Sequence, residues 1–373
     1  MAARSGTRTG YGKGARGARV TRALAVAVVG AVPLLAGCGS ASASPGPDGA
    51  TALQRVLADP DPDADEIIEA AGAPSEVARA TDGSLLLAYY LRDEEGGEDG
   101  AVAWRVYGPD GEEVAEHGQA GYRYWQVHGV GGGFVFAPKA ETEGFFLDVS
   151  GQARELRTED GARAVRKGDV LVNELEPTVA YRPSAGTLAP LGGLPDDNQH
   201  TAVDRAGTTW SVPMWGEKDA SVAWLTAKGE RGRHTFGLPE GTAPQEFAAD
   251  GGTAAVTLAE DETAPDPRVR ALVLTTDAGA TWRTLTDSSR LPLSSLTDPA
   301  LTALRDGRLL IGERDAGYWL ADTPANASFH RLETPAAFDE IVPLGRTLYG
   351  IADGEGMWTS KDGGRNWAPY EEA

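Results

Sequence analysis

From about residue 75 onward, the chain alternates short runs of apolar, β-branched or aromatic residues with polar turns. Examples are HTAVDRAGTTWSVP at 200–213, LTALRDGRLLIGE at 301–313 and EIVPLGRTLYGIAD at 340–353. Each example contains two such runs separated by a turn that includes Gly. Runs of this kind, bounded by Gly, Pro, Asn or Asp, predict β-strands joined as hairpins.

The hairpins recur along the chain in one repeated unit. The second hairpin turn of each unit lies near Asp110, Gly151, Ala185, Gly229, Gly279, Pro324 or Gly364. Four short strands per unit at a period of roughly 42 residues are typical of a β-propeller. We therefore predict an all-β fold in which residues 80–373 form a β-propeller of seven blades, each with four antiparallel strands. Six or eight blades are the alternatives, because the first and third units match the pattern least well.

The first 37 residues differ from the rest of the chain. Several Arg and Lys residues, with no Asp or Glu among them, precede an apolar run at 23–36. This run is too short for a transmembrane helix, which needs about 20 residues. Residues 1–37 therefore predict a secretory signal peptide. Its end overlaps the string LAGC at 35–38, which holds the only cysteine of the chain.

This string resembles the lipobox of bacterial lipoproteins at all four positions. The resemblance implies cleavage between Gly37 and Cys38 and a diacylglycerol on the Cys38 sulfur. Two or more acyl chains hold a protein stably at a membrane. We therefore expect a lipid-anchored protein on the extracytoplasmic face of the cell membrane. A soluble secreted protein with an incidental cysteine is the alternative.

Two segments separate the predicted anchor from the propeller. Residues 38–63 begin with the lipidated Cys38, are rich in Ser, Ala, Gly and Pro, and become acidic toward their end. This composition predicts a flexible tether. Residues 64–79 predict a short helix or a lead-in strand, because DADEIIEAAG at 63–72 starts with Asp and ends with Gly.

Two of the hairpin turns share a stricter pattern, TTDAGATW at 275–282 and SKDGGRNW at 360–367. We expect the Asp carboxylate to accept N–H bonds from its turn and the Gly to supply the positive φ that closes it. The hydroxyl residues can bond across the hairpin, and the Trp ring can pack between blades. The shared positions are Thr275, Asp277, Gly279, Thr281 and Trp282 in the first copy and Ser360, Asp362, Gly364 and Trp367 in the second.

Both turns resemble the Asp-box, or BNR repeat, of sialidase-like propellers, which reads Ser/Thr-x-Asp-x-Gly-x-Thr-Trp. The first copy matches fully, and the second has Asn366 where the pattern has Thr or Ser. The resemblance implies a structural role on outer hairpins away from an active site, because Asp-boxes also occur in non-enzymatic propellers.

A sialidase-like glycoside hydrolase is the alternative function that this resemblance implies. Such enzymes use an Arg-Ile-Pro segment, an arginine triad, a Tyr–Glu nucleophile pair and an acid/base Asp. The chain has no Arg-Ile-Pro, and its nearest string is YRP at 181–183. The five His lack metal-ligand spacing, and no phosphate loop, dinucleotide motif or Gly-x-Ser-x-Gly elbow occurs. We assign no catalytic residue and no cofactor.

Charge narrows the choice of partners. The formal net charge is −21, which is opposite to what a nucleic-acid backbone attracts, so nucleic acid is not an expected partner. Acidic residues gather in the loops between the second and third strands of the units. Antiparallel strands place these loops on the face opposite the two matched turns. The candidate acidic binding face comprises Glu94, Glu95, Trp215, Glu217, Asp219, Asp261, Glu262, Glu313, Asp315 and Asp353.

Two interpretations of this face remain open. Acidic turns keep an exported domain soluble without any further role. Alternatively, the face binds a cationic ligand, such as Ca²⁺ held by carboxylates, or a basic protein, with Trp215 as an apolar anchor. The sequence thus predicts a monomeric, membrane-anchored propeller that acts as a non-enzymatic module for binding a ligand or protein.

Overall fold

The computed structural model describes residues 51–92, 100–121, 125–138, 144–173, 178–192, 200–212, 219–260, 264, 267–325, 328–352 and 355–371. By its contacts the chain divides into two units, Met1–Ser44 and Pro45–Ala373, and every described residue belongs to the second. The predicted signal peptide, Cys38 and the first part of the predicted tether lie outside the described residues.

The described strands form seven four-stranded sheets, which confirms the prediction of a seven-bladed all-β propeller. The first blade consists of β1 (Glu76–Arg79), β2 (Leu85–Arg92), β3 (Gly100–Tyr107) and β4 (Glu113–Ala120), and the second of β5 (Trp125–Val130), β6 (Gly133–Pro138), β7 (Phe145–Asp148) and β8 (Ala153–Glu155). The third consists of β9 (Arg157–Thr158), β10 (Val170–Asn173), β11 (Val179–Arg182) and β12 (Thr187–Pro190), and the fourth of β13 (His200–Val203), β14 (Thr209–Val212), β15 (Asp219–Leu225) and β16 (Arg231–Gly237).

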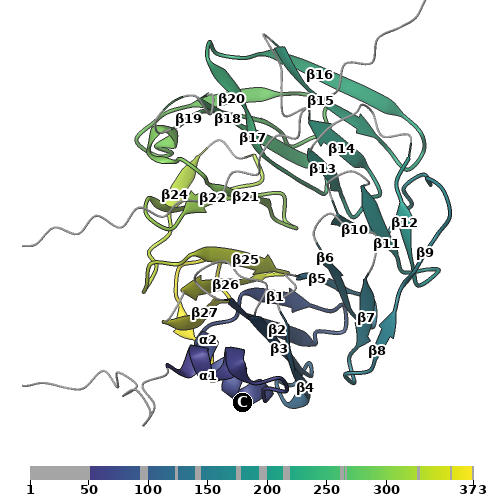
Figure 1. Cartoon of the computed structure of the whole chain (residues 1–373). Coiled ribbons are helices and arrows are strands. Elements are labelled where there is room, and N and C mark those ends of the chain that lie inside the picture. Colours follow the sequence, from purple (N-terminus) through teal and green to yellow (C-terminus); the bar gives the residue numbers. More distant parts are fainter. Residues whose placement is uncertain are drawn as a thin grey trace, which may run out of the picture. The chain divides into compact units, whose positions relative to one another are not determined.

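The last three blades follow in the same way (Figure 1). The fifth consists of β17 (Thr242–Asp250), β18 (Thr253–Glu260), β19 (Val269–Thr275) and β20 (Arg283–Thr286), and a 3-10 helix, η1 (Leu293–Ser295), follows it. The sixth consists of β21 (Ala300–Ala303), β22 (Leu309–Glu313), β23 (Gly317–Ala321) and β24 (Phe329–Arg331), and the seventh of β25 (Glu340–Leu344), β26 (Thr347–Ala352), β27 (Gly356–Ser360) and β28 (Ala368–Pro369).

The third blade departs from the predicted pattern. Its sheet order is β10-β11-β12-β9, so the turn near Ala185 joins the second and third strands of the sheet rather than the third and fourth. Strand β9 pairs parallel with β12, with Arg157 opposite Thr187. A single residue separates β8 from β9, so the chain passes directly from the outer edge of the second blade to that of the third. A buried ion pair at 2.9 Å between Arg182 and Asp169 joins the end of β11 to the segment before β10.

Two short helices precede the first blade, α1 (Ala52–Ala58) and α2 (Ala64–Ala71). Helix α1 lies within the segment predicted to be a flexible tether, and the propeller begins at Glu76 rather than at residue 80. The helix forms because Thr51 and Gln54 make a capping box at its start. Helix α2 has Asp63 as its N-cap and packs on the first blade. Among the described residues, no helix has the length and apolar character needed to cross a membrane.

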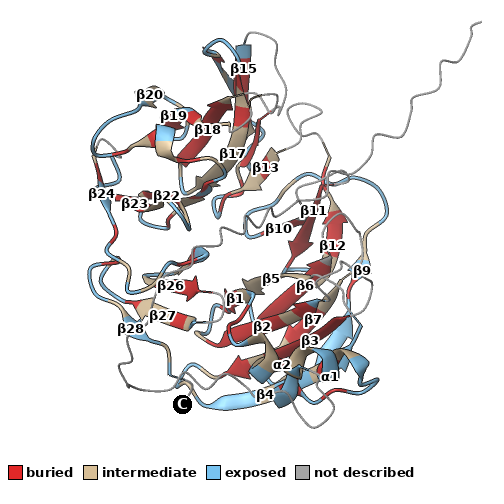
Figure 2. Cartoon of the chain, turned by 60° about the vertical axis from the view of Figure 1, so that its left-hand side comes forward, coloured by how far each residue is buried: buried red, intermediate tan, exposed pale blue. Residues whose placement is uncertain are grey.

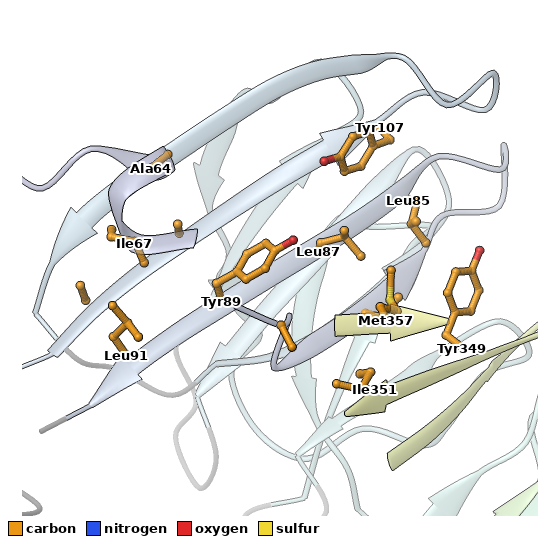
Figure 3. Packing of buried hydrophobic residues seen from close by; sticks show 14 of the residues in the cluster. Ala64, Ile67, Leu85, Leu87, Tyr89, Leu91, Tyr107, Tyr349, Ile351 and Met357 are labelled. Atoms are coloured by element: carbon orange, nitrogen blue, oxygen red, sulfur yellow. The ribbon is translucent and has the colours of Figure 1, made fainter. Parts of the chain in front are cut away.

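The core lies between the sheets. Side chains of a strand alternate between its two faces, so Leu86 packs toward the second blade, whereas Leu87 joins a cluster with Tyr349 and Met357 of the seventh (Figure 3). The inner strands of the sheets carry most of the buried residues, whereas β4 is largely exposed (Figure 2). No described sheet holds strands of both the first and seventh blades. These two blades therefore meet through side-chain packing rather than through a shared strand.

Candidate binding site on the turn face

The turn at 275–282 is built around one carboxylate. Asp277 accepts hydrogen bonds from the Thr281 backbone N–H at 2.8 Å, the Thr281 hydroxyl at 2.6 Å and the Thr275 hydroxyl at 2.8 Å. The two hydroxyls thus bond to the carboxylate instead of to each other across the hairpin. The bond from the Thr281 side chain is the main cause of a lowered pKa of Asp277. Gly279 has a φ of 90°, and its carbonyl accepts the Trp282 indole N–H at 3.2 Å.

The Trp282 ring packs between the fourth and fifth blades. It stacks on His234 of β16, with ring centroids 4.9 Å apart and an interplanar angle of 2°. It also lies near Trp224 of β15, at 6.2 Å between centroids. The contacts join the end of this turn to the outer strands of the preceding blade.

The turn at 360–367 has the same architecture with one substitution. Asp362 accepts the Ser360 hydroxyl at 2.9 Å and the Asn366 backbone N–H at 3.0 Å. The Asn366 side-chain amide donates to the second carboxylate oxygen at 2.6 Å, so it replaces the hydroxyl of the first copy. This amide bond is the largest cause of the lowering of the pKa of Asp362 to about 2. Gly364 has a φ of 85°.

Trp367 differs from Trp282 in its polar atom. Its ring packs edge-on against Phe338, with centroids 4.9 Å apart. Its indole N–H is buried and has no hydrogen-bond partner among the described residues. The second copy therefore holds a buried donor that the first copy satisfies within its own turn.

The turn at 360–367 lies between two hollows. Both are lined by first and third hairpin turns of neighbouring blades, which share one face because successive strands run antiparallel; we call it the turn face. The seam pocket, between the seventh and first blades, has a volume of about 700 Å³. Its aromatic and apolar lining includes Leu85, Tyr107, Tyr349, Trp367 and Tyr370, and its charged lining includes Arg79, Asp110, Lys361, Asp362 and Glu371.

Three tyrosines meet in the seam pocket. The Tyr370 ring lies 6.4 Å from those of Tyr107 and Tyr349 between centroids. Tyr107 belongs to β3 of the first blade and Tyr349 to β26 of the seventh, and both are buried in the shared core (Figure 3). The floor of the seam pocket is thus fixed by the packing that joins these two blades.

The basic pocket, on the other side of the same turn, lies between the sixth and seventh blades and has a volume of about 770 Å³. Its cationic lining consists of Arg305, Arg308, Arg346, Lys361 and Arg365, and its carboxylates are Asp306, Asp322 and Asp362. His330 also lines it and contacts Asp322 at 2.7 Å. The basic pocket thus has an excess of cationic side chains, although the whole chain carries a net charge of −21.

Neither hollow was predictable from the sequence. The cationic residues occur in the separate turns LRDGRL, GR and SKDGGR between residues 304 and 365. Only the packing of neighbouring blades places these turns together. Net charge averages over the whole chain, so it hides a local excess of the opposite sign.

Most of the candidate acidic face falls outside the described residues. Glu94, Glu95, Trp215, Glu217, Asp261, Glu262 and Asp353 lie outside them. Asp219 and Asp315 are exposed, at the start of β15 and in the turn after β22. Glu313 accepts backbone N–H bonds from Thr297 at 3.0 Å and Asp298 at 2.8 Å, so its carboxylate fixes a local segment.

A smaller hollow, of about 530 Å³, lies at the end of the fifth blade opposite the turn face. Its lining includes Glu240, Glu260 and Arg270. Arg270 donates to Glu260 from Nε at 2.9 Å, and the hydrogen bond from its side chain is the main cause of a lowered pKa of Glu260. Within the described part of the chain, no group of three or more His, Cys, Asp or Glu side chains is arranged to hold a metal ion. The Ca²⁺ proposal therefore rests on the sequence alone.

No protein-family model matches the chain, and no curated protein matches its sequence. Among solved structures, it is similar to a puromycin-hydrolyzing peptidase of Mycobacterium tuberculosis, with 14% identity and a TM-score of 0.46 over 81% of this chain and 54% of that one. It is also similar to an uncharacterized protein from Listeria monocytogenes, with 14% identity, a TM-score of 0.45, and coverage of 71% and 82%. The β-propeller domain of the Trilobed protease from Pyrococcus furiosus matches with 8% identity, a TM-score of 0.34, and coverage of 80% and 84%. The chain spans about half the length of the peptidase. At these identities and scores, no conclusion about activity follows.

Proposed function

We propose that this protein is a lipid-anchored, extracytoplasmic β-propeller that binds a ligand or protein without chemical turnover, and that the seam pocket holds the ligand. The seam pocket is the observation that carries the proposal. Its volume of about 700 Å³ falls in the usual range for small-molecule sites. It also combines aromatic walls with a few charged groups, the usual composition of such sites.

The lipid anchor rests on the sequence at 35–38 and on its resemblance to a lipobox. An anchor at Cys38 would leave the propeller outside the cytoplasm, at the end of the segment that precedes α1. Replacing Cys38 by Ser then moves the protein from the membrane fraction to the soluble fraction of an expressing bacterium. Retention of the Cys38→Ser variant in the membrane fraction would contradict the anchor.

Binding without turnover is supported by one arginine, Arg182, and two carboxylates, Asp277 and Asp362, that are already engaged in structural contacts. Arg182, from the string nearest to Arg-Ile-Pro, is 1% exposed and pairs with Asp169. Asp362, with its pKa lowered to about 2, remains ionised at neutral pH and cannot serve as a proton donor there. Both Asp277 and Asp362 hold their own turns. The hydrogen bonds in these turns support the structural role that the resemblance to the Asp-box implies for Asp277 and Asp362.

The alternative, a sialidase-like glycoside hydrolase, has one observation in its favour. The carboxyl of Glu340, at the start of β25, has a pKa raised by desolvation, as a general acid requires, although the residue is exposed to solvent. A panel of fluorogenic sialosides and other glycosides tests this alternative. Release of the fluorophore by the native protein but not by Glu340→Gln would replace our proposal with the hydrolase.

Binding is tested with arrays of glycans and peptides and the full chain purified in detergent. Tyr370→Ala removes one wall of the seam pocket, whereas Tyr370→Phe keeps the ring. Val114→Ala, at an exposed position on β4, is the matched control. We expect probes that the native protein, Tyr370→Phe and Val114→Ala retain and Tyr370→Ala releases. Retention of no probe, or equal retention by Tyr370→Ala, would contradict the proposal.

A further inference from the structure

We propose that the basic pocket is a second binding site, which takes a ligand carrying a phosphate monoester. This site goes beyond the proposed function, because it lies on the other side of residues 360–367 from the seam pocket. It is formed between the sixth and seventh blades rather than between the seventh and first, although Lys361 and Asp362 line both hollows. A failure of this proposal and a failure of the seam-pocket proposal would therefore be seen with different variants.

The charges of the basic pocket do not cancel internally. Asp306 is paired with Arg308, whose Nε donates at 2.9 Å. Asp322 is in contact with His330, and Asp362 is saturated by its own turn. Each of the three carboxylates of the basic pocket is therefore engaged already. None of them neutralises the remaining cations.

Four cations of the basic pocket have no partner among the described residues. In the part of the chain that the structure describes, the side chains of Arg305, Arg346, Lys361 and Arg365 make no ion pair or hydrogen bond. Like charges gathered at one hollow repel one another, and a bound anion relieves that repulsion. An acidic chain has carboxylates in abundance to neutralise such a cluster, so the absence of pairing at this hollow points to an external anion.

The turns that present these cations are rigidly defined. Gly307 and Gly345 close the first hairpin turns of the sixth and seventh blades with φ of 85° and 71°. Gly363 has a φ of 75°, and a Cβ at this position would lie 3.6 Å from Nη2 of Arg308. The four hydrogen bonds that Asp362 accepts in its turn fix the backbone that carries Lys361 and Arg365. The cations are therefore held on three preorganised turns rather than on a long loop.

The number and type of cations select the ligand class. A phosphate monoester carries a charge of about −1.5 to −2 at pH 7, with three acceptor oxygens, whereas a carboxylate carries a single charge. Arginine forks bind phosphate oxygens in pairs. The volume of the basic pocket, about 770 Å³, is larger than an inorganic ion requires, so the pocket can accommodate an organic group attached to the phosphate. The negative field of the rest of the chain is screened beyond about 8 Å at physiological ionic strength, so the nearby cations dominate.

The test is calorimetric titration of the full chain, purified in a maltoside detergent, with glycerol 3-phosphate. Arg305→Gln combined with Arg346→Gln removes two exposed cations from turns. Arg231→Gln, exposed on β16 of the fourth blade, is the matched control for the same change of charge. Because a hydrogen bond to a charged group changes affinity by about tenfold or more, we expect at least a tenfold loss for each arginine. We expect no change for Arg231→Gln and weaker binding as salt is raised.

Two further ligands define the chemistry and its source. Glycerate, in which a carboxylate replaces the phosphate, is expected to bind at least tenfold more weakly. Dihexanoyl phosphatidic acid distinguishes a lipid headgroup from a soluble phosphate: tighter binding than glycerol 3-phosphate assigns the site to lipid, and equal or weaker binding assigns it to a soluble ester. Binding of neither phosphate at about 10 mM, equal binding of glycerate, or equal affinity in the double variant would overturn the proposal.

Discussion

Replacing Ile67 by Ala tests whether the two N-terminal helices belong to the propeller fold. Ile67 is 0% exposed, and it belongs to a cluster with Leu91 of the first blade (Figure 3). Ala101 of the same blade is also part of this cluster. Truncating a buried isoleucine to alanine costs about 2–5 kcal/mol, which combines lost transfer energy with the cavity left behind. If α2 folds together with the first blade, Ile67→Ala lowers the free energy of unfolding by this amount.

The assay is urea unfolding of the full chain in detergent, followed by circular dichroism of the β-sheet. At roughly 2 °C per kcal/mol for a domain of this size, the matching shift in melting temperature is about 4–10 °C. Glu69→Ala, exposed on the same helix, is the control and changes the stability by no more than about 0.5 kcal/mol. If Ile67→Ala unfolds at the same urea midpoint as the native chain, the helices melt independently of the blades and the reasoning is refuted.

Three further predictions concern the turns and the third blade. The pKa of Asp362 is lowered from 3.8 to about 2 in the folded state, so its contribution to stability is complete above pH 3.8 and is lost as the pH falls toward 2. Asp362→Asn should therefore be less stable than the native chain at pH 6. The difference between the unfolding midpoints of the two proteins should disappear in acid. Gly279→Ala places a Cβ 2.7 Å from an indole ring at a position of positive φ, whereas the Cβ of Gly121→Ala, at a φ of 94°, has no atom within 4 Å. Gly279→Ala should therefore lower the melting temperature more than Gly121→Ala. Equal effects of the two variants would mean that backbone strain alone causes the loss. Arg182→Ala leaves the buried Asp169 without its ion-pair partner and should lower the free energy of unfolding in urea by about 3–5 kcal/mol. If adding Asp169→Ala restores native stability, the loss comes from the unpaired buried charge.

The sequence predicted the architecture well, because the blade period is marked by turns. Gly and Asp positions such as Gly279 and Gly364 recur at intervals that the strands between them must share, so the seven blades follow from local chemistry. The third blade was not predictable in this way. Strand β9 has two residues, Arg157 and Thr158, and its parallel pairing depends on a neighbour far along the chain.

Composition misled the prediction at the N-terminal side of the propeller. The Ser, Ala, Gly and Pro content of residues 38–63 predicts a tether, whereas Ala52–Ala58 within this segment form α1 behind the capping pair Thr51 and Gln54. The basic pocket could not be predicted from short stretches of sequence, for a different reason. Arg305 and Arg365 are 60 positions apart and meet only because adjacent blades align their turns. The acidic face stays a prediction for the positions outside the described residues.

The junction of the first and seventh blades has a consequence for the dynamics of the propeller. Neighbouring strands within a blade are joined by ladders of backbone hydrogen bonds, whereas these two blades are held by packed side chains, including Tyr349 and Met357. Amide hydrogens along β1 and β25 should therefore exchange with solvent by a local separation of the two blades that requires less energy than global unfolding. A molecule bound in the seam pocket touches both blades, so by mass action it must slow that exchange. A bound ligand would then hold the first and seventh blades together.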